Sequence, residues 1–343
     1  MSNKTVDVII PCYNEHRFIG TMLDSVISQD YPAHLVKIYV ADGMSEDGTR
    51  EVLKSYQQKY SNIFIIDNPH KVTPYALNSA LKASNSEVVV RMDCHAYYPS
   101  NYISYLVEKL FSTGADNVGV CLETMPASES DKSYGIALAI SIPIGVGNSM
   151  FRTGVSAARD ADTVPFGCYR REVFTRIGLF DEELVRGQDG DLNSRLLNAG
   201  GRIVLLPENK VKYFARDTFL KLSKMYYQYG LYKPFTNYKA KRIMSWRQFV
   251  PTSFLFTILS LVIVGVVVPK LWVLPIAFFA MYEIAVGFFI VRSSSKITRF
   301  NSGVFASALW SVNLLHFSYG WGFLKGFVLL LAKRRPGNVR INR

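Results

Sequence analysis

The sequence has few cysteines, and their spacing argues against the common kinds of zinc site. Four cysteines occur among 343 residues, and no two of them stand in a C-x-x-C pair. The opening MSNKTVDVII predicts a strand rather than a signal peptide, because its apolar run is short. We therefore expect the front of the chain to stay in the cytosol, with free thiols that are buried or half-buried. The four cysteines are Cys12, Cys94, Cys121 and Cys168.

Acidic residues are scarce in the second half of the chain. Residues 1–209 contain 19 Lys or Arg and 25 Asp or Glu, whereas residues 210–248 contain ten basic residues and one acid, and residues 249–343 again contain ten and one. The net charge of +12 therefore comes from the back of the chain, where long apolar runs lie. This arrangement favours anionic membrane lipids over nucleic acid as the partner.

Short apolar runs alternate with helical patterns in the front of the chain. The alternation predicts an α/β fold with a mostly parallel central sheet that helices cover on both faces. The predicted strands are TVDVIIPCY, VKIYVAD, NIFIID and EVVVRMD. In such sheets, ligands bind at the carboxyl ends of the strands, where Asp42 and Asp93 lie together with Tyr13 and Glu15. Asp47 is expected to cap the helix that follows the second strand.

Long runs with almost no charge predict a helical membrane anchor in the back of the chain. Residues 250–268 carry no charge and residues 271–291 carry one, and each run exceeds the ~18 residues of a transmembrane candidate. The run 304–331 is long but contains several polar residues at near-helical spacing. We expect it to form a re-entrant or interfacial pair of short helices, broken near Gly320 and Gly322, or else a tilted third span.

Two further features concern the membrane. Residues 134–147 are apolar but too short to span a bilayer, so they form either a core helix, which we favour, or an element that dips into the interface. Basic residues follow position 332, the last of them Arg340 and Arg343. They favour a cytosolic tail, because positive charges close to span ends tend to remain inside.

Four motifs follow one another in the front of the chain: IIPCYNE, ADGMSEDGT, RMDCHAYYP and GQDGDLNSRL. In this order they resemble the family-2 glycosyltransferases, over roughly residues 5–235. Two more pieces, FGCYRREVFTRIGLFDEEL and RDTFLKLSKMYYQYGLYK, resemble the succinoglycan-type glucosyltransferases of exopolysaccharide assembly. The resemblance implies the GT-A nucleotide-sugar-binding fold. Together with the charge distribution and the apolar runs, it predicts a cytosolic catalytic domain at 1–215, a basic interfacial segment at 216–248 and a membrane domain at 249–343.

The first two motifs concern the nucleotide. The resemblance implies that Asp42 accepts a hydrogen bond from a uracil N–H, and that Pro11, Tyr13 and Glu15 line the nucleotide pocket. The family has a second aspartate where this chain has Gly43. From the residues alone, Asp42 could instead cap the following helix, and Glu15 could begin a helix at whose start an acid is favoured.

The third motif concerns a metal. The family binds a divalent cation with an Asp-x-Asp pair at this strand end, and this chain has Asp93 and His95 there. The resemblance implies that the cation bridges the diphosphate of the donor and stabilises the leaving group. Because magnesium prefers oxygen ligands, the imidazole leads us to expect Mn²⁺ rather than Mg²⁺. His95 could instead be a loop residue or a hydrogen-bond partner of the diphosphate.

The fourth motif offers a general base. The family has a Glu-Asp pair here whose aspartate takes the proton of the acceptor, so the resemblance gives this role to Asp189, while Gln188 replaces the glutamate. One base on the side opposite the leaving group implies inversion at the anomeric carbon. Asp191 and Arg195 lie one helical turn apart and are expected to form a structural ion pair.

Contacts with the acceptor or the diphosphate are expected from Gln188, Arg216, Gln228 and Lys233. Gln228 matches the first residue of the Q-x-x-R-W motif of processive polysaccharide synthases, but Leu231 and Tyr232 replace the Arg and Trp. Their replacement argues against a processive enzyme. The basic residues of this segment could equally form a solvated face.

These features predict a membrane-associated inverting glycosyltransferase, specifically a hexosyltransferase. The expected donor is a UDP-sugar, and the expected acceptor is a polyprenyl-pyrophosphate-linked saccharide in bacterial exopolysaccharide or cell-surface polysaccharide assembly. We expect a multi-pass protein of the cytoplasmic membrane whose catalytic domain faces the cytosol. One alternative is a polyprenyl-phosphate glycosyltransferase, and another is a non-catalytic sugar-nucleotide-binding scaffold of a synthase complex.

Overall fold

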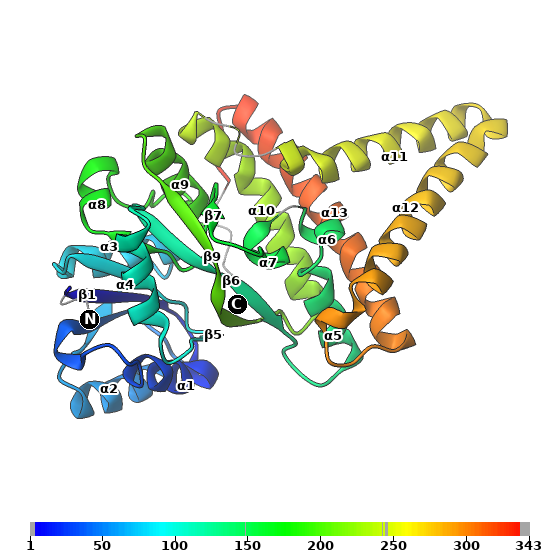
Figure 1. The fold of residues 1–343 in the computed structure, drawn as a ribbon. Helices are drawn as coiled ribbons and strands as arrows, with labels where there is room; N and C mark the ends of the chain where they lie inside the picture. The colour runs from blue at the N-terminus through cyan, green and yellow to red at the C-terminus, as the bar shows by residue number, and fades with distance from the viewer. Residues whose placement is uncertain (1–3, 148, 242, 244–245, 337–343) are drawn as a thin grey trace. The chain divides into compact units, whose positions relative to one another are not determined.

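A computed structural model describes residues 4–147, 149–241, 243 and 246–336 (Figure 1). The predicted tail residues Arg340 and Arg343 lie outside the described residues. The contacts between residues divide the chain into two compact units. The first comprises residues 1–123 and 154–213, and the second comprises residues 124–153 and 214–343.

A mixed sheet forms the centre of the first unit, and within the described residues it has nine strands. The strands lie in the order β3-β2-β1-β4-β8-β6-β9-β5, and β7 pairs with β9. Their bounds are β1 Val6–Cys12, β2 Val36–Asp42, β3 Ile63–Asp67, β4 Val88–Arg91, β5 Ala96–Tyr97, β6 Asn117–Met125, β7 Arg159–Asp160, β8 Cys168–Arg170 and β9 Ile203–Phe214. The apolar run of β1 is buried along its whole length, as expected for a central strand with both faces covered.

The pairing directions divide this sheet into two halves. β3, β2, β1 and β4 are parallel neighbours, which confirms the alternation of strands and helices predicted for the front of the chain. The pairs β4–β8, β6–β8, β5–β9 and β7–β9 are antiparallel, so the sheet as a whole is mixed. Because β1, β2 and β4 run in the same direction, their carboxyl ends lie at one edge of the sheet.

The helices of the first unit pack through apolar stripes. Their bounds are α1 His16–Ile27, α2 Thr49–Lys59, α3 Thr73–Ala83, α4 Tyr102–Ser112, α8 Glu172–Ile177 and α9 Gln188–Asn198, with a short 3₁₀ turn η1 at Ala33–Leu35. In α1, Ile19, Leu23 and Val26 recur at helical spacing and are buried. The four cysteines are free and buried, as predicted.

The second unit is helical. Its helices are α5 Asp131–Ala139, α6 Pro143–Val146, α7 Met150–Thr153, α10 Phe219–Ala240, α11 Val250–Val267, α12 Val273–Arg292 and α13 Ser302–Leu331, with 3₁₀ turns η2 Trp246–Phe249, η3 Pro269–Trp272 and η4 Ser294–Lys296. The helices α11 and α12 form a hairpin through η3, yellow to orange in Figure 1. Among the described residues, three helices are long and apolar enough to cross a membrane: Trp246–Val267, Pro269–Arg292 and Ser302–Leu331.

The expected break in the run 304–331 is wrong, because α13 is one continuous helix from Ser302 to Leu331. The glycines are contact points between helices. A Cβ on Gly322 would lie 2.2 Å from the carbonyl oxygen of Tyr227 on α10, and a Cβ on Gly320 would lie 2.8 Å from the carbonyl oxygen of Pro251 on α11. Glycine therefore permits close backbone packing here.

The polar residues of α13 do not form the expected interfacial face. Ser311 is fully buried and donates to the carbonyl of Ser307. Ser318 lies 2.8 Å from the hydroxyl of Ser223 on α10. Protein contacts therefore cover these positions, because neighbouring helices pack against this side of α13.

The insertion 124–153 belongs to the second unit, although it lies in sequence within the predicted catalytic domain. Residues 134–147 form most of α5 and all of α6, and the chain turns before Pro143. Most of α5 is buried, and a Cβ on Gly135 would lie 2.5 Å from the Cβ of Ser307 on α13. Within this insertion, α5 therefore packs against the C-terminal helix α13. The choice between a core helix and an interfacial element stays a prediction.

Candidate active site

The carboxyl ends of β1, β2 and β4 bring the first three motifs to one edge of the sheet. Cys12 of β1 is the register partner of Asp42, the last residue of β2, and Ile9 of β1 is the partner of Arg91, the last residue of β4. The residues that follow these strands therefore converge, as the sequence predicted.

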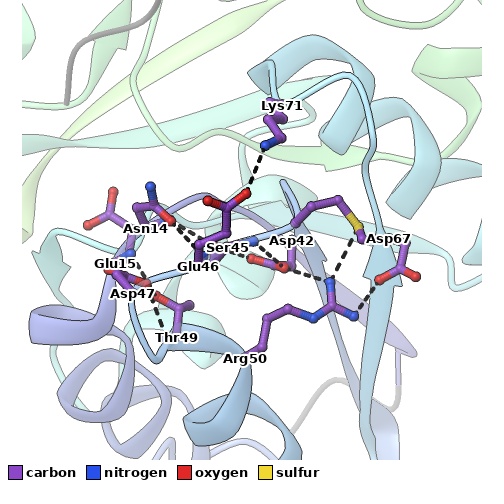
Figure 2. A network of polar contacts seen from close by, with 11 residues as sticks. Asn14, Glu15, Asp42, Ser45, Glu46, Asp47, Thr49, Arg50, Asp67 and Lys71 are labelled. Carbon is purple, nitrogen blue, oxygen red and sulfur yellow. Dashed lines mark hydrogen bonds and ion pairs between the residues drawn. The ribbon is translucent and has the colours of Figure 1, made fainter.

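Asp42 lies at the centre of a polar network (Figure 2). Its side chain is fully buried, and its carboxylate accepts from the backbone N–H of Ser45 at 3.0 Å and from the Ser45 hydroxyl at 2.5 Å. Arg50 Nη1 donates to the same carboxylate at 2.8 Å, while Arg50 Nη2 donates to Asp67 at 2.7 Å. The Asp42 carboxylate thus accepts three hydrogen bonds within the protein, and the predicted contact with a uracil N–H stays a prediction.

Tyr13 explains why glycine follows Asp42. A Cβ on Gly43 would lie 2.9 Å from Cδ2 of the Tyr13 ring, which is closer than a side chain can approach. The Nζ of Lys71 lies 5.6 Å from the centre of the same ring, within the range of a cation–π contact. The departure from the family's second aspartate therefore makes room for Tyr13. Pro11 lies on β1, two residues before Tyr13, and is buried.

Asp47 caps two helices, as the sequence predicted for one of them. Its carboxylate accepts from the backbone N–H of His16 at 3.1 Å and from Thr49, through the backbone N–H at 3.1 Å and the hydroxyl at 2.5 Å. Burial opposes ionisation of this side chain, but the hydrogen bonds from Thr49 and His16 outweigh it and lower the pKa of Asp47 below its usual value. Asp47 is therefore structural.

His95 lies against the first motif. Its Nδ1 is 3.6 Å from Oε1 of Glu15, and its ring lies edge-on to Tyr213 with centroids 5.6 Å apart. The Glu15 residue precedes α1 but makes no side-chain cap, and its side chain is 7% exposed. Two residues that the sequence assigned to different roles, Glu15 and His95, are thus neighbours.

The predicted metal ligands at this edge are Asp93 and His95. Among the residues that the structure describes, no three His, Cys, Asp or Glu side chains form a ready cluster. Asp93 supplies a carboxylate and His95 an imidazole two residues on, which is a donor pair that suits manganese when diphosphate oxygens complete the shell. The pair therefore fits a cation that arrives with the donor.

Arg91 connects the carboxylate of Asp93 to that of Asp189. Its Nη2 and Nε donate to Asp93 Oδ1 at 3.1 and 3.3 Å, and its Nη1 donates to Asp189 Oδ1. Asp189 lies in the first turn of α9 and keeps one third of its side chain exposed. Burial raises the pKa of Asp189 above the usual range of a carboxyl group, although Arg91 opposes the rise. Arg91 is the first residue of the third motif, RMDCHAYYP, but the sequence assigned it no role, because one of its two partners lies on a helix that begins 97 residues later.

The remaining predicted residues divide between the two units. Gln188 begins α9 and is buried. Arg216, Gln228 and Lys233 belong to the second unit, so their contacts with an acceptor stay predictions.

The expected pair of Asp191 and Arg195 is confirmed at 2.9 Å. Arg195 also donates to the carbonyls of Ile177 and Leu179, at 2.5 and 2.8 Å. Its role is therefore to hold α9 against the preceding loop.

Comparison with known proteins shows the family to which the chain belongs. Residues 7–172 match the family model described as glycosyl transferase family 2. The succinoglycan biosynthesis protein ExoA of Rhizobium meliloti is 30% identical, over 71% of this chain and 73% of its own length. A dolichyl N-acetyl-alpha-D-glucosaminyl phosphate 3-beta-D-2,3-diacetamido-2,3-dideoxy-beta-D-glucuronosyltransferase of Methanococcus voltae is 27% identical, over 77% of this chain and 83% of its own.

The fold is similar to that of a solved glycosyltransferase. The mannosyltransferase PcManGT of Pyrobaculum calidifontis, in complex with GDP-Man and Mn²⁺, has a TM-score of 0.57 at 16% identity, over 98% of this chain and 89% of the other. This likeness, together with the family match and the relatives, identifies the chain as a member of glycosyl transferase family 2 with the GT-A fold.

Proposed function

We propose that this glycosyltransferase inverts the anomeric centre as it moves a sugar from a UDP-sugar to a polyprenyl-pyrophosphate-linked saccharide. The product belongs to exopolysaccharide or cell-surface polysaccharide assembly. The observation that carries the proposal is the Arg91 bridge. It sets Asp93, a carboxylate suited to a cation that accompanies the donor diphosphate, beside Asp189, a carboxylate suited to the acceptor hydroxyl.

Asp189 is the base in this proposal. Its carboxylate takes the proton of the acceptor hydroxyl as that oxygen attacks the anomeric carbon. The bond between the anomeric carbon and the diphosphate breaks on the opposite face, and the nucleoside diphosphate departs with the bonding electrons. The raised pKa of Asp189 makes it a stronger base than an ordinary aspartate.

Asp93 and His95 would hold a divalent cation, with manganese preferred, that offsets the charge of the departing diphosphate. Tyr13 and the Arg50 network would form the nucleotide side of the pocket, close to Pro11, Glu15 and Asp42. Among the proposed acceptor contacts, Gln188 lies next to the base in sequence.

The membrane part of the proposal is supported by the helices and the charge of the second half. Three described helices could span a bilayer, and residues 210–248 carry ten basic residues against one acid. We propose that the protein is multi-pass in the cytoplasmic membrane, with the catalytic domain on the cytosolic side and anionic lipids against the basic segment. One relative is named for succinoglycan biosynthesis and the other for transfer to a dolichyl-phosphate-linked sugar, which supports a lipid-linked acceptor.

A donor screen tests the proposal. Purified protein is incubated with Mn²⁺ and a panel of UDP-, GDP- and dTDP-sugars, with and without a lipid extract of the host cells, and released nucleoside diphosphate is measured. We expect one UDP-sugar to give release that the lipid extract stimulates. If a GDP- or dTDP-sugar were the best donor, the proposal of a UDP-sugar donor would be wrong. If no donor released nucleoside diphosphate, the proposed transfer reaction would be wrong. Stimulation by polyprenyl phosphate alone would favour the polyprenyl-phosphate alternative.

A further inference from the structure

Arg91 has an unusual position for a charged residue. It ends β4, whose other three residues are buried valines, and it is itself 4% exposed. Its backbone N–H donates to the carbonyl of Gly167 at 3.0 Å, and Ile9 is its register partner on β1. Neighbouring strands therefore fix its backbone, and the side chain reaches the site from a rigid base.

The guanidinium group meets two carboxylates with different nitrogens. Nε and Nη2 donate to Asp93, and Nη1 donates to Asp189. The donors of arginine lie in one rigid plane, so a guanidinium held by both acids fixes how far apart those acids stand. A lysine ammonium has no such fork and could not hold both acids in the same geometry.

The backbone of α9 does not depend on this bridge. Asn193, one turn after Asp189, is fully buried and accepts from Asn117 Nδ2 at 3.0 Å. Asn193 also donates to the hydroxyl of Thr163 at 2.8 Å. The pair of Asp191 and Arg195 holds the other side of the helix. What Arg91 adds is therefore the orientation of the Asp189 side chain.

Stability alone gives a weak reason for a buried arginine. Removing charges from water costs several kcal/mol for each ion, and apolar residues of similar size often stabilise a fold as well. Both acids also keep exposed surface, 18% of the Asp93 side chain and 33% of the Asp189 side chain. The bridge therefore holds two carboxylates that can still meet ligands.

We infer that Arg91 is a positioning residue for transfer, which holds the Asp189 carboxylate at a fixed distance and angle from Asp93. The inference rests on the proposed function, because it gives Arg91 its effect through the proposed base. It assigns Arg91 no contact with the sugar. The consequence is that the donor-side acid and the acceptor-side acid are mechanically linked through one side chain.

The test compares Arg91→Met and Arg91→Lys in two backgrounds, with Asp189 intact and with Asp189→Asn. Transfer is measured under single-turnover conditions with the best donor of the screen, UDP affinity is measured by calorimetry with Mn²⁺, and the melting temperature is recorded. Arg195→Met is the matched control, because Arg195 also pairs with an acid of α9 but lies outside the site.

We expect Arg91→Met to lower the transfer rate about 10–100-fold, since a base misplaced by 1 Å can cost that much. UDP affinity should change far less. In the Asp189→Asn background, the same substitution should have little further effect, because the group it positions is gone. Arg91→Lys should recover only part of the rate, and Arg195→Met should lower the melting temperature while the rate stays near that of the wild type.

The inference would be overturned if Arg91→Met lowered the transfer rate by the same factor in the Asp189→Asn background as in the wild type. It would also be overturned if Arg91→Lys had the full wild-type rate, or if Arg195→Met lost as much rate as Arg91→Met. If Arg91→Met does not fold, the rate loss of Arg91→Lys is compared in the same two backgrounds and tests the inference in the same way. A wild-type rate in Asp189→Asn alone would overturn the proposed base, and with it the role assigned to Arg91, whatever the Arg91 variants do.

Discussion

In the first unit, Arg50 bridges Asp42 and Asp67, and Arg91 bridges Asp93 and Asp189. The most buried residue is an aspartate in the first cluster and the arginine in the second. In the cluster of Arg50, Asp42 is fully buried and Asp67 is 60% exposed, while the arginine lies between them at 24%. This cluster ties the end of β2 to the end of β3 (Figure 2). Its deepest carboxylate, Asp42, has no exposed surface.

In the cluster of Arg91, the arginine is the buried member and both acids keep exposed surface. A carboxylate with exposed surface can meet an incoming cation or hydroxyl group directly, and Asp93 and Asp189 both have such surface. In the proposed function, the Arg50 cluster would shape the nucleotide side of the site, and the Arg91 cluster would present the two acids.

The largest expected effect comes from Asp189→Asn. Loss of the base should lower the transfer rate by roughly 10²–10⁴-fold, while UDP affinity stays near that of the wild type, because the substitution lies on the acceptor side of the Arg91 cluster. Single-turnover transfer and calorimetry with UDP measure the two quantities. A variant that keeps more than about a tenth of the rate would show that Asp189 is not the base.

The second effect concerns the cation on the donor side of the same cluster. Chelation with EDTA should abolish transfer, and Mn²⁺ should restore it better than Mg²⁺. His95→Asp should shift the preference toward Mg²⁺, because oxygen ligands suit that ion. Full activity in EDTA would contradict the metal, whereas an unchanged metal profile in the variant would contradict only the role of His95.

The smallest effect is expected at the other cluster. Arg50→Met should weaken UDP binding by roughly tenfold, the order of one hydrogen bond to a charged group, and should leave the rate at saturating donor nearly unchanged. Titration of transfer against donor concentration separates the two quantities. Arg202→Met is the control, because that side chain pairs with Asp160 at the surface and should change neither. A lower saturating rate with unchanged UDP affinity would mean that the two arginine clusters do not divide their roles in this way.

The parallel half of the sheet could be predicted because its signal is local. Apolar runs followed by Asp42 and Asp93 mark strand ends in the sequence itself, and parallel strands place those ends together. The placement of Asp189 beside Asp93 came from the resemblance. The arginine that joins them could not be found this way, because its two partners are 2 and 98 residues away in sequence.

The glycines show the opposite limit. In the sequence, the length of the apolar run and the spacing of its polar residues favoured a pair of short helices, and Gly320 and Gly322 marked the expected break. In the structure, the backbones of α10 and α11 lie against these positions, and the packing that glycine permits holds one continuous helix. The effect of a glycine thus depended on a partner helix that no local pattern describes. Gly43, likewise, could be understood only once the ring of Tyr13 was seen beside it.

The stereochemistry of the product tests the central claim most directly. A single base, Asp189, on the face opposite the leaving diphosphate implies one displacement and therefore inversion. The sugar product is isolated after transfer from an α-linked donor, and its anomeric configuration is read from the proton coupling constant in an NMR spectrum. We predict a β-linked product. An α-linked product would mean retention and would contradict the mechanism built on the Arg91 cluster.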